Sequence, residues 1–84
     1  MTEHARTKDE FFLVCLYQEA RKQADVDDPL DRYAIGQLAG LHKTAVDTIC
    51  VLLMKTNFIK KHGQVEISIT PHGMKLAEQL IKNK

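Results

Sequence analysis

The chain has 84 residues, a formal net charge of +1 and 44% hydrophobic residues, a composition typical of one ordinary globular domain. The first ten residues are polar and charged, and no stretch is long and apolar enough for a signal peptide or a membrane span. We therefore expect a cytoplasmic protein with no membrane partner. Residues 1–41 hold five Lys or Arg against eight Asp or Glu, whereas residues 42–84 hold seven Lys against three acidic residues. The basic half is either a surface for nucleic acid or a solvated lysine-rich face.

Residues 1–7 are expected to form a flexible tail and residues 8–84 a single folded domain. A first helix is predicted from about Lys8 to Gln23. At its centre the seven apolar or aromatic residues 11–17 cover every side of a helix, whereas a surface helix needs only one apolar stripe. Such a helix either lies centrally in the monomer or meets a second subunit. The pattern is compatible with both.

An acidic connector at residues 24–30 separates this helix from the next. Its aspartates lack the full spacing of a calcium loop, so we interpret them as solvated or capping residues and expect no metal site. Asp28 followed by Pro29 is typical of a helix N-cap with proline at the first helical position. A second helix is accordingly predicted over Pro29–Ala39.

The next residues have the spacing of a helix–turn–helix. A third helix is predicted over His42–Thr56, after a short turn that contains Gly40. Gly36 stands where the second and third helices would cross closely. The third helix is expected to end at Asn57, a residue that tolerates the left-handed conformation of a C-cap. Its core-facing residues, at helical spacing, are Val46, Ile49, Cys50 and Leu53.

Two strands are predicted over Phe58–Lys61 and Val65–Thr70, joined by a turn with Gly63 at its tip. Thr70 and Pro71 then have the pattern of an N-cap and a first helical residue. The buried side of this last helix is expected to hold Met74, Leu76, Ala77, Leu80 and Ile81. The two cysteines, Cys15 and Cys50, lie in apolar helical runs and are expected to be buried and reduced.

This order of elements resembles the winged helix-turn-helix superfamily, and within it small bacterial and archaeal regulators of the MarR and PadR kind. In those families the recognition helix ends in a segment like residues 55–59, and the wing runs into a segment like residues 69–76. The resemblance implies an α+β, mostly helical fold with a three-helix core, a two-stranded wing hairpin and a C-terminal helix. Wings of the MarR type commonly carry an Asp-x-Arg element near the tip, where this hairpin has Lys60, Lys61 and His62.

The resemblance further implies a transcriptional regulator that binds duplex DNA. In this architecture the N-terminal part of the recognition helix meets the base edges, while wing lysines contact phosphates. Asp47 repels phosphate, and would help only by accepting from cytosine N4 or by orienting Lys43. The alternatives are a solvated helix face and lysines that protect an edge strand. The residues expected to contact DNA are His42, Lys43, Thr44, Asp47, Thr48, Lys60, Lys61 and His62.

In related regulators the first and last helices often build a dimer interface, and the resemblance implies a homodimer here. The residues expected at that interface are Phe11, Phe12, Leu13, Leu16 and Leu80. The alternative function is a winged-helix module that binds another protein without touching DNA. This alternative is favoured by the modest charge, by Asp47, and by apolar Val51 and Met54 near the end of the third helix. The dispersed histidines and the absence of a phosphate-binding glycine loop predict neither catalysis nor a cofactor.

Overall fold

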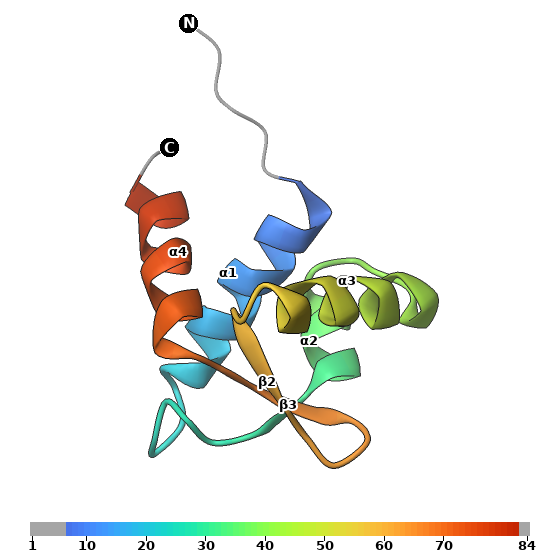
Figure 1. Cartoon of the computed structure of the whole chain (residues 1–84), viewed down its shortest axis with the longest axis horizontal. Coiled ribbons are helices and arrows are strands. Elements are labelled where there is room, and N and C mark those ends of the chain that lie inside the picture. Colours follow the sequence, from blue (N-terminus) through green and yellow to red (C-terminus); the bar gives the residue numbers. More distant parts are fainter. Residues whose placement is uncertain (1–6, 83–84) are drawn as a thin grey trace, which may run out of the picture.

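The computed structural model describes residues 7–82. Within this range the chain forms four helices and three short strands, and the confirmed class is a small, mostly helical α+β fold (Figure 1). The predicted tail falls, except for Thr7, outside the described residues. In chain order the elements are α1 (Lys8–Ala20), β1 (Leu30–Asp31), α2 (Arg32–Leu38), α3 (Lys43–Lys55), β2 (Ile59–His62), β3 (Glu66–Ile69) and α4 (Pro71–Lys82).

Thr7 is the N-cap of α1 and not part of a tail. Its side-chain oxygen accepts from the backbone N–H of Glu10 at 3.3 Å, and its own backbone N–H donates to Glu10 Oε1 at 3.1 Å. This reciprocal capping box satisfies two N–H groups that have no partner inside the helix. The helix ends at Ala20, three residues before the predicted end at Gln23.

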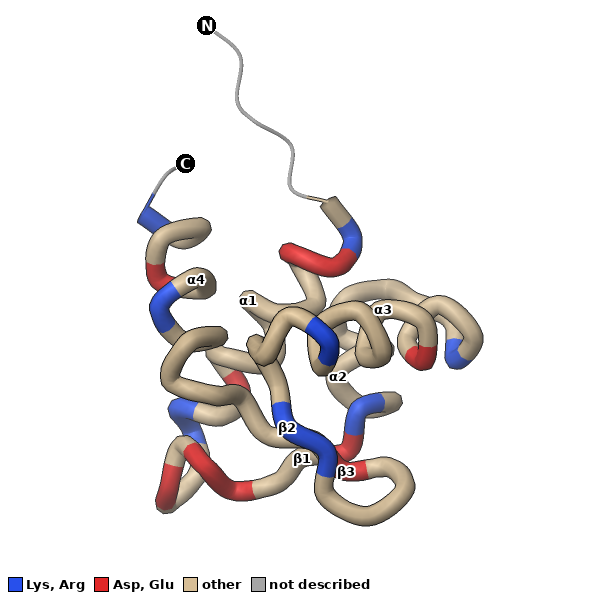
Figure 2. The backbone as a smooth tube through the Cα atoms, in the orientation of Figure 1, with Lys and Arg blue, Asp and Glu red and all other residues tan. Residues whose placement is uncertain are grey.

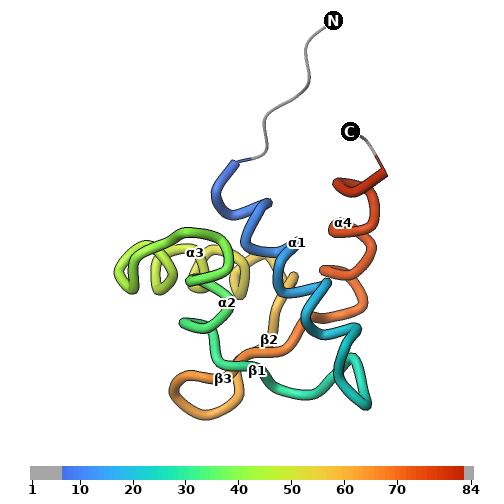
Figure 3. The backbone as a smooth tube through the Cα atoms, turned by 180° about the vertical axis from the view of Figure 1, so that it is seen from behind, coloured from blue at the N-terminus to red at the C-terminus, as the bar shows by residue number. Residues whose placement is uncertain are grey.

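The apolar run of α1 lies at the centre of the monomer. Phe12, Leu13 and Leu16 are fully buried, and α1 packs against α2, α3, β3 and α4. Figures 1 and 3 show α1 and α4 side by side in two opposite views. The Tyr17 hydroxyl joins them by donating to Glu78 Oε2 at 2.7 Å. The position of α1 inside one chain therefore explains why its apolar residues cover all sides.

Helices α2 and α3 cross closely at Gly36, as predicted. A Cβ atom on Gly36 would lie 2.3 Å from Cγ2 of Val46, so only glycine permits this approach. Gly40, with a φ of 73°, lies in the turn between the helices, as expected. Asn57 has a φ of 68° after α3, which confirms the left-handed residue predicted there.

The start of α2 differs from the prediction. Leu30 and Asp31 form a strand, β1, that pairs antiparallel with β3. Because paired strand residues are extended, neither residue can belong to the helix. The helix therefore begins at Arg32, and its N-cap is Asp31, whose carboxylate accepts from the backbone N–H of Tyr33 at 2.8 Å. Asp28 and Pro29 lie before the strand and do not cap the helix.

The predicted hairpin is present as β2 and β3, which pair antiparallel from Ile59 opposite Ile69 to His62 opposite Glu66. Together with β1 they make a three-stranded sheet of order β1-β3-β2, of which β1 was not predicted. Thr70 caps α4 as expected, because its hydroxyl oxygen accepts from the Gly73 N–H at 2.9 Å.

The core-facing residues of α3 are the predicted ones, because Val46, Ile49, Cys50 and Leu53 are all buried. On α4, Ala77 is fully buried, and Met74, Leu76 and Ile81 pack half-buried against the core. Cys15 and Cys50 are both buried, as predicted, and no disulfide joins them. Between residues 7 and 82 no helix has both the length and the apolar character needed to cross a membrane.

Candidate nucleic-acid interface

An exposed stripe runs along α3 on the side away from the core. Its residues recur at positions i, i+1, i+4, i+5 and i+8, a spacing that places them on one side of a helix. His42 precedes the stripe as the exposed N-cap, and its side chain makes no capping hydrogen bond. The stripe consists of Lys43, Thr44, Asp47, Thr48 and Val51, all exposed. Five of the eight residues predicted to contact DNA, counting His42, thus share one surface.

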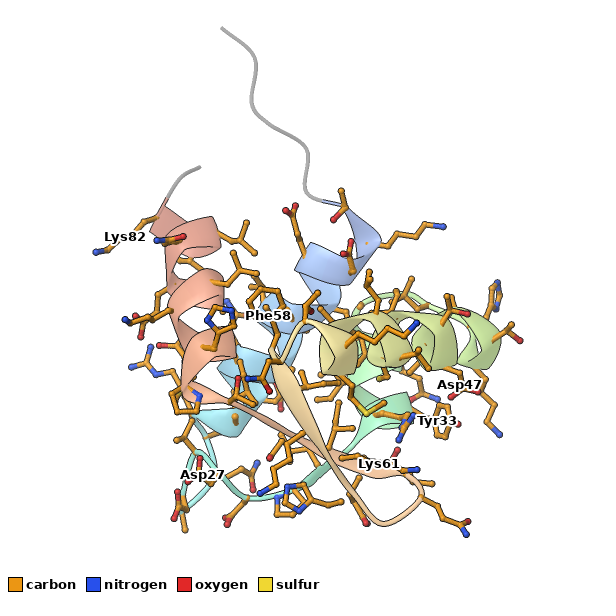
Figure 4. All side chains as sticks on the ribbon, in the orientation of Figure 1. Asp27, Tyr33, Asp47, Phe58, Lys61 and Lys82 are labelled. Carbon is orange, nitrogen blue, oxygen red and sulfur yellow. The ribbon has the colours of Figure 1, made fainter. Side chains whose placement is uncertain are left out.

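Asp47 is held by two residues of α2, one of which, Tyr33, is labelled near it in Figure 4. The Tyr33 hydroxyl donates to Asp47 Oδ1 at 2.7 Å, and Arg32 Nη1 lies 3.9 Å from the same oxygen. The amino group of Lys43 lies over the Tyr33 ring, 5.1 Å from its centroid. The hydrogen bond to Asp47, with a smaller contribution from burial, raises the pKa of Tyr33, so the hydroxyl keeps its proton beyond the pH at which an ordinary tyrosine ionises.

Arg32 connects the same stripe to the hairpin. Its guanidinium is buried, and it donates from Nε to the Val65 carbonyl oxygen at 2.8 Å and from Nη2 to the Gln64 carbonyl oxygen at 3.2 Å. Arg32 and Tyr33 were not among the predicted site residues. The available signal was an arginine that closely follows the acidic connector, but its hydrogen-bond partners in the hairpin lie more than 30 residues away.

The hairpin supplies the second group of predicted residues. Lys60 and Lys61 are exposed on β2, and Figure 2 shows them as a basic segment on the strand. His62 is half-buried, with Nε2 2.8 Å from the Ser68 hydroxyl, so its ring lies against β3. In Figures 1 and 3 the loop of the hairpin and the N-terminal half of α3 project to the same side of the molecule.

An open groove adjoins the other edge of the α3 stripe. It lies between the start of α1 and α3, with a volume of about 630 Å³. Its apolar lining comes mainly from α3, while charged residues of α1 stand at its edge. Nearby on the surface Val51 and Leu52 are 48% and 46% exposed. The residues lining the groove are Lys8, Asp9, His42, Thr44, Ala45, Thr48, Ile49 and Leu52.

The residues predicted for a dimer interface do not form one surface. Phe12, Leu13 and Leu16 have no exposed area in the monomer, so they cannot contact a second copy. Leu80 is half-buried on α4. Phe11, 40% exposed at the start of α1, is the predicted residue that presents a large apolar side chain to solvent.

Among residues 7–82 no group of three or more His, Cys, Asp or Glu side chains is arranged to hold a metal ion. His72, on α4, stacks on Phe58 with ring centroids 4.6 Å apart.

Neither a protein-family model nor a curated protein sequence matches this chain.

Proposed function

We propose that the chain is a winged helix-turn-helix protein that binds duplex DNA and regulates transcription. Helix α3 is the recognition helix that enters the major groove, and the β2–β3 hairpin is the wing that lies along the phosphate backbone. The proposal is supported by the order of elements, by the close α2–α3 crossing at Gly36 and by the small antiparallel sheet.

The observation that carries the proposal is that exposed lysines of α3 and of the hairpin lie on one side of the molecule. Lys43 begins the exposed stripe of α3, and Lys60 with Lys61 lie on the hairpin that projects to the same side. Lysines at these two places neutralise phosphates on either side of a groove, while the polar residues between them meet base edges. The acidic connector between α1 and β1 lies away from this side (Figure 2).

We propose further that the protein binds DNA as a homodimer. The start of α1 and the end of α4 both lie at the end of the molecule away from the hairpin (Figures 1 and 3). Phe11 is exposed there, and Leu80 is half-buried on the neighbouring helix. A two-fold axis through this end leaves both copies of α3 free to contact a palindromic site.

A second candidate function is docking of another protein. It is favoured by three exposed apolar side chains, Val51 and Leu52 on α3 and Leu38 on α2. Apolar side chains form neither ion pairs nor hydrogen bonds with DNA phosphates, whereas they are typical of a protein-docking surface. A winged-helix scaffold serves either function, because the function depends on the surface and not on the fold.

The deciding experiment is affinity for mixed-sequence duplex DNA, measured by fluorescence anisotropy over a salt series. The proposal predicts binding at low salt, with log affinity falling steeply as log salt rises, because each neutralised phosphate releases counterions. No binding at low salt would overturn the DNA-binding proposal. The same α3 surface would then be tested by pull-down of protein partners, with Leu52→Asp as the variant that disrupts docking.

A further inference from the structure

Building on the proposed DNA binding, we propose that Asp47 reads a base in the major groove. Its carboxylate, held in place by Tyr33, accepts a hydrogen bond from the N4 amino group of a cytosine. Asp47 is thus a determinant of sequence preference, and Tyr33 is the residue that positions it. The sequence alone left Asp47 with two possible roles, of which the orientation of Lys43 was the other.

The contacts of Lys43 favour base reading over that other role. The Lys43 amino group lies over the ring of Tyr33, and the ion pair that Asp47 forms is with Arg32. Lys43 is therefore oriented by the aromatic ring, through a cation–π contact. This arrangement leaves the outer side of the Asp47 carboxylate unoccupied by Lys43.

The geometry of Asp47 suits a fixed acceptor. Its side chain is 54% exposed in the middle of the α3 stripe. Both α2 contacts go to Oδ1, and within residues 7–82 no hydrogen bond reaches Oδ2. A side chain already held by one hydrogen bond loses less conformational entropy when it binds than a free one does. Oδ2 is thus the oxygen that is available to DNA.

The charge of Asp47 is offset within the protein. A carboxylate on a surface that faces DNA is otherwise repelled by phosphates. Arg32 places a positive charge 3.9 Å from Asp47, and its side chain is only 7% exposed, so solvent screens the pair less than it screens a surface ion pair. The cation that offsets the negative charge of Asp47 is thus a buried residue of the protein itself.

The chemistry of a carboxylate selects the base. An ionised carboxylate only accepts hydrogen bonds, and the donors in the major groove are the amino groups of cytosine and adenine. Adenine presents the acceptor N7 beside its amino group, which repels a carboxylate oxygen, whereas cytosine has no acceptor of its own next to N4. Cytosine is therefore the base that Asp47 favours.

The test is selection from a random duplex DNA library by the full chain, followed by sequencing of the bound fraction. Wild type is compared with Asp47→Asn, Tyr33→Phe and the control Asp27→Asn. The control makes the same chemical change in the connector far from α3 (Figure 4). Circular dichroism of each variant verifies that the fold is retained, and Asp47→Ala serves as a second variant at the same position.

We expect wild type to select a site with one strongly preferred cytosine in each half. Asp47→Asn and Asp47→Ala should lower that preference by about tenfold while the other positions stay unchanged. The asparagine variant should also shift the preference toward a purine, because its amide group donates to N7. Tyr33→Phe should keep cytosine but weaken the discrimination several-fold, with an unchanged dependence of affinity on salt. Asp27→Asn should select the wild-type site.

Two results would overturn the assignment while the proposed function stands. One is a wild-type site without a preferred cytosine, and the other is an unchanged preference in both Asp47 variants. If wild type binds no duplex at low salt, DNA binding and base reading both fail together.

Discussion

The buried guanidinium of Arg32 donates from Nε to the carbonyl oxygen of Val65 at 2.8 Å, and this bond ties the start of α2 to the loop end of the hairpin. The same side chain reaches the Gln64 carbonyl oxygen at 3.2 Å and lies 3.9 Å from Asp47 on α3. One residue therefore contacts both elements that we propose for DNA binding. The position of the hairpin relative to α3 depends on it.

Replacing Arg32 should destabilise the fold and loosen the hairpin. Arg32→Met keeps the aliphatic length but removes two hydrogen bonds from a charged donor, with an expected loss of about 2–3 kcal/mol in the free energy of unfolding. Urea denaturation measures this loss. Arg21→Met is the matched control: Arg21 is exposed and lies over the Tyr17 ring, so its loss should cost less than about 1 kcal/mol. Equal losses in both variants would contradict the bridging role of Arg32.

The close crossing of α2 and α3 predicts an unusual effect of alanine. In an unobstructed helix Gly→Ala stabilises by about 0.5–1 kcal/mol. At Gly36 the added Cβ would lie 2.3 Å from Val46 Cγ2, so we expect Gly36→Ala to destabilise by about 1–3 kcal/mol instead. Thermal or urea unfolding gives the sign directly.

A second substitution makes this test specific to the helix crossing. Val46→Ala removes Cγ2, the methyl group that the new Cβ would meet, but leaves a cavity when it is introduced alone. The loss of unfolding free energy in the double variant Gly36→Ala/Val46→Ala should therefore be smaller than the sum of the two single losses, by at least about 0.5 kcal/mol. If the two losses simply add, the contact between the new Cβ and Val46 is not the cause of the destabilisation.

The hairpin lysines should contribute to DNA affinity without reading sequence. Lys60→Glu with Lys61→Glu should weaken binding to all duplexes alike and reduce the slope of log affinity against log salt by about 2, because two phosphate contacts are lost. The control is Lys75→Glu with Lys82→Glu, the same charge change on α4, for which we expect little change in slope. Lys43→Ala, in contrast, should lose affinity preferentially for the selected site. Anisotropy titrations that give the same slope for both double variants would exclude the hairpin as the wing.

Phe11 and Phe12 are neighbours in the sequence, but replacing each with aspartate should affect folding differently. Phe12 is fully buried, so Phe12→Asp places a charge in the core and should abolish folding. Phe11 is 40% exposed, so Phe11→Asp should keep the wild-type circular dichroism spectrum. If α1 contributes to a homodimer, Phe11→Asp should also shift the sedimentation coefficient toward that of a monomer. A wild type that sediments as a monomer at high concentration would remove the dimer proposal.

Burial of Cys50 gives the fold a defined dependence on alkaline pH. Desolvation raises the pKa of the Cys50 thiol to about 11, from 9.0. The folded state thus holds this proton more tightly than the unfolded state, and stability is lost as pH rises from about 9 to about 11. The loss reaches about 2 kcal/mol from this group. Cys50→Ala should lack that component, so the difference in unfolding free energy between wild type and variant should shrink over this range. A constant difference would contradict the assignment.

Much of the fold could be predicted from the sequence, because the signals are local. The helical spacing of apolar residues located α3 and α4, and the alternation after Gly63 located the hairpin. Caps and special glycines are decided by neighbouring residues as well. Thr70 before Pro71 and the left-handed Asn57 were both confirmed for that reason.

The third strand and the start of α2 could not be predicted. Asp28 and Pro29 satisfy the local rules for a helix start, but Leu30 and Asp31 pair with Ile67 and Glu66, far along the chain. A two-residue strand has no periodicity of its own, so nothing in its sequence distinguishes it from a connector. Its existence depends on the edge of β3 that it covers.

Sequence alone determined the amphipathic face of α3, and with it which residues of that helix reach solvent, because helix geometry fixes the side of every residue. Only the tertiary structure decided that the apolar α1 is central, since the same seven residues fit a buried helix or a dimer seam. It also decided the surroundings of Asp47. The partners Tyr33 and Arg32 approach it through the α2–α3 crossing, and contacts between separate elements are set by packing that no local pattern encodes.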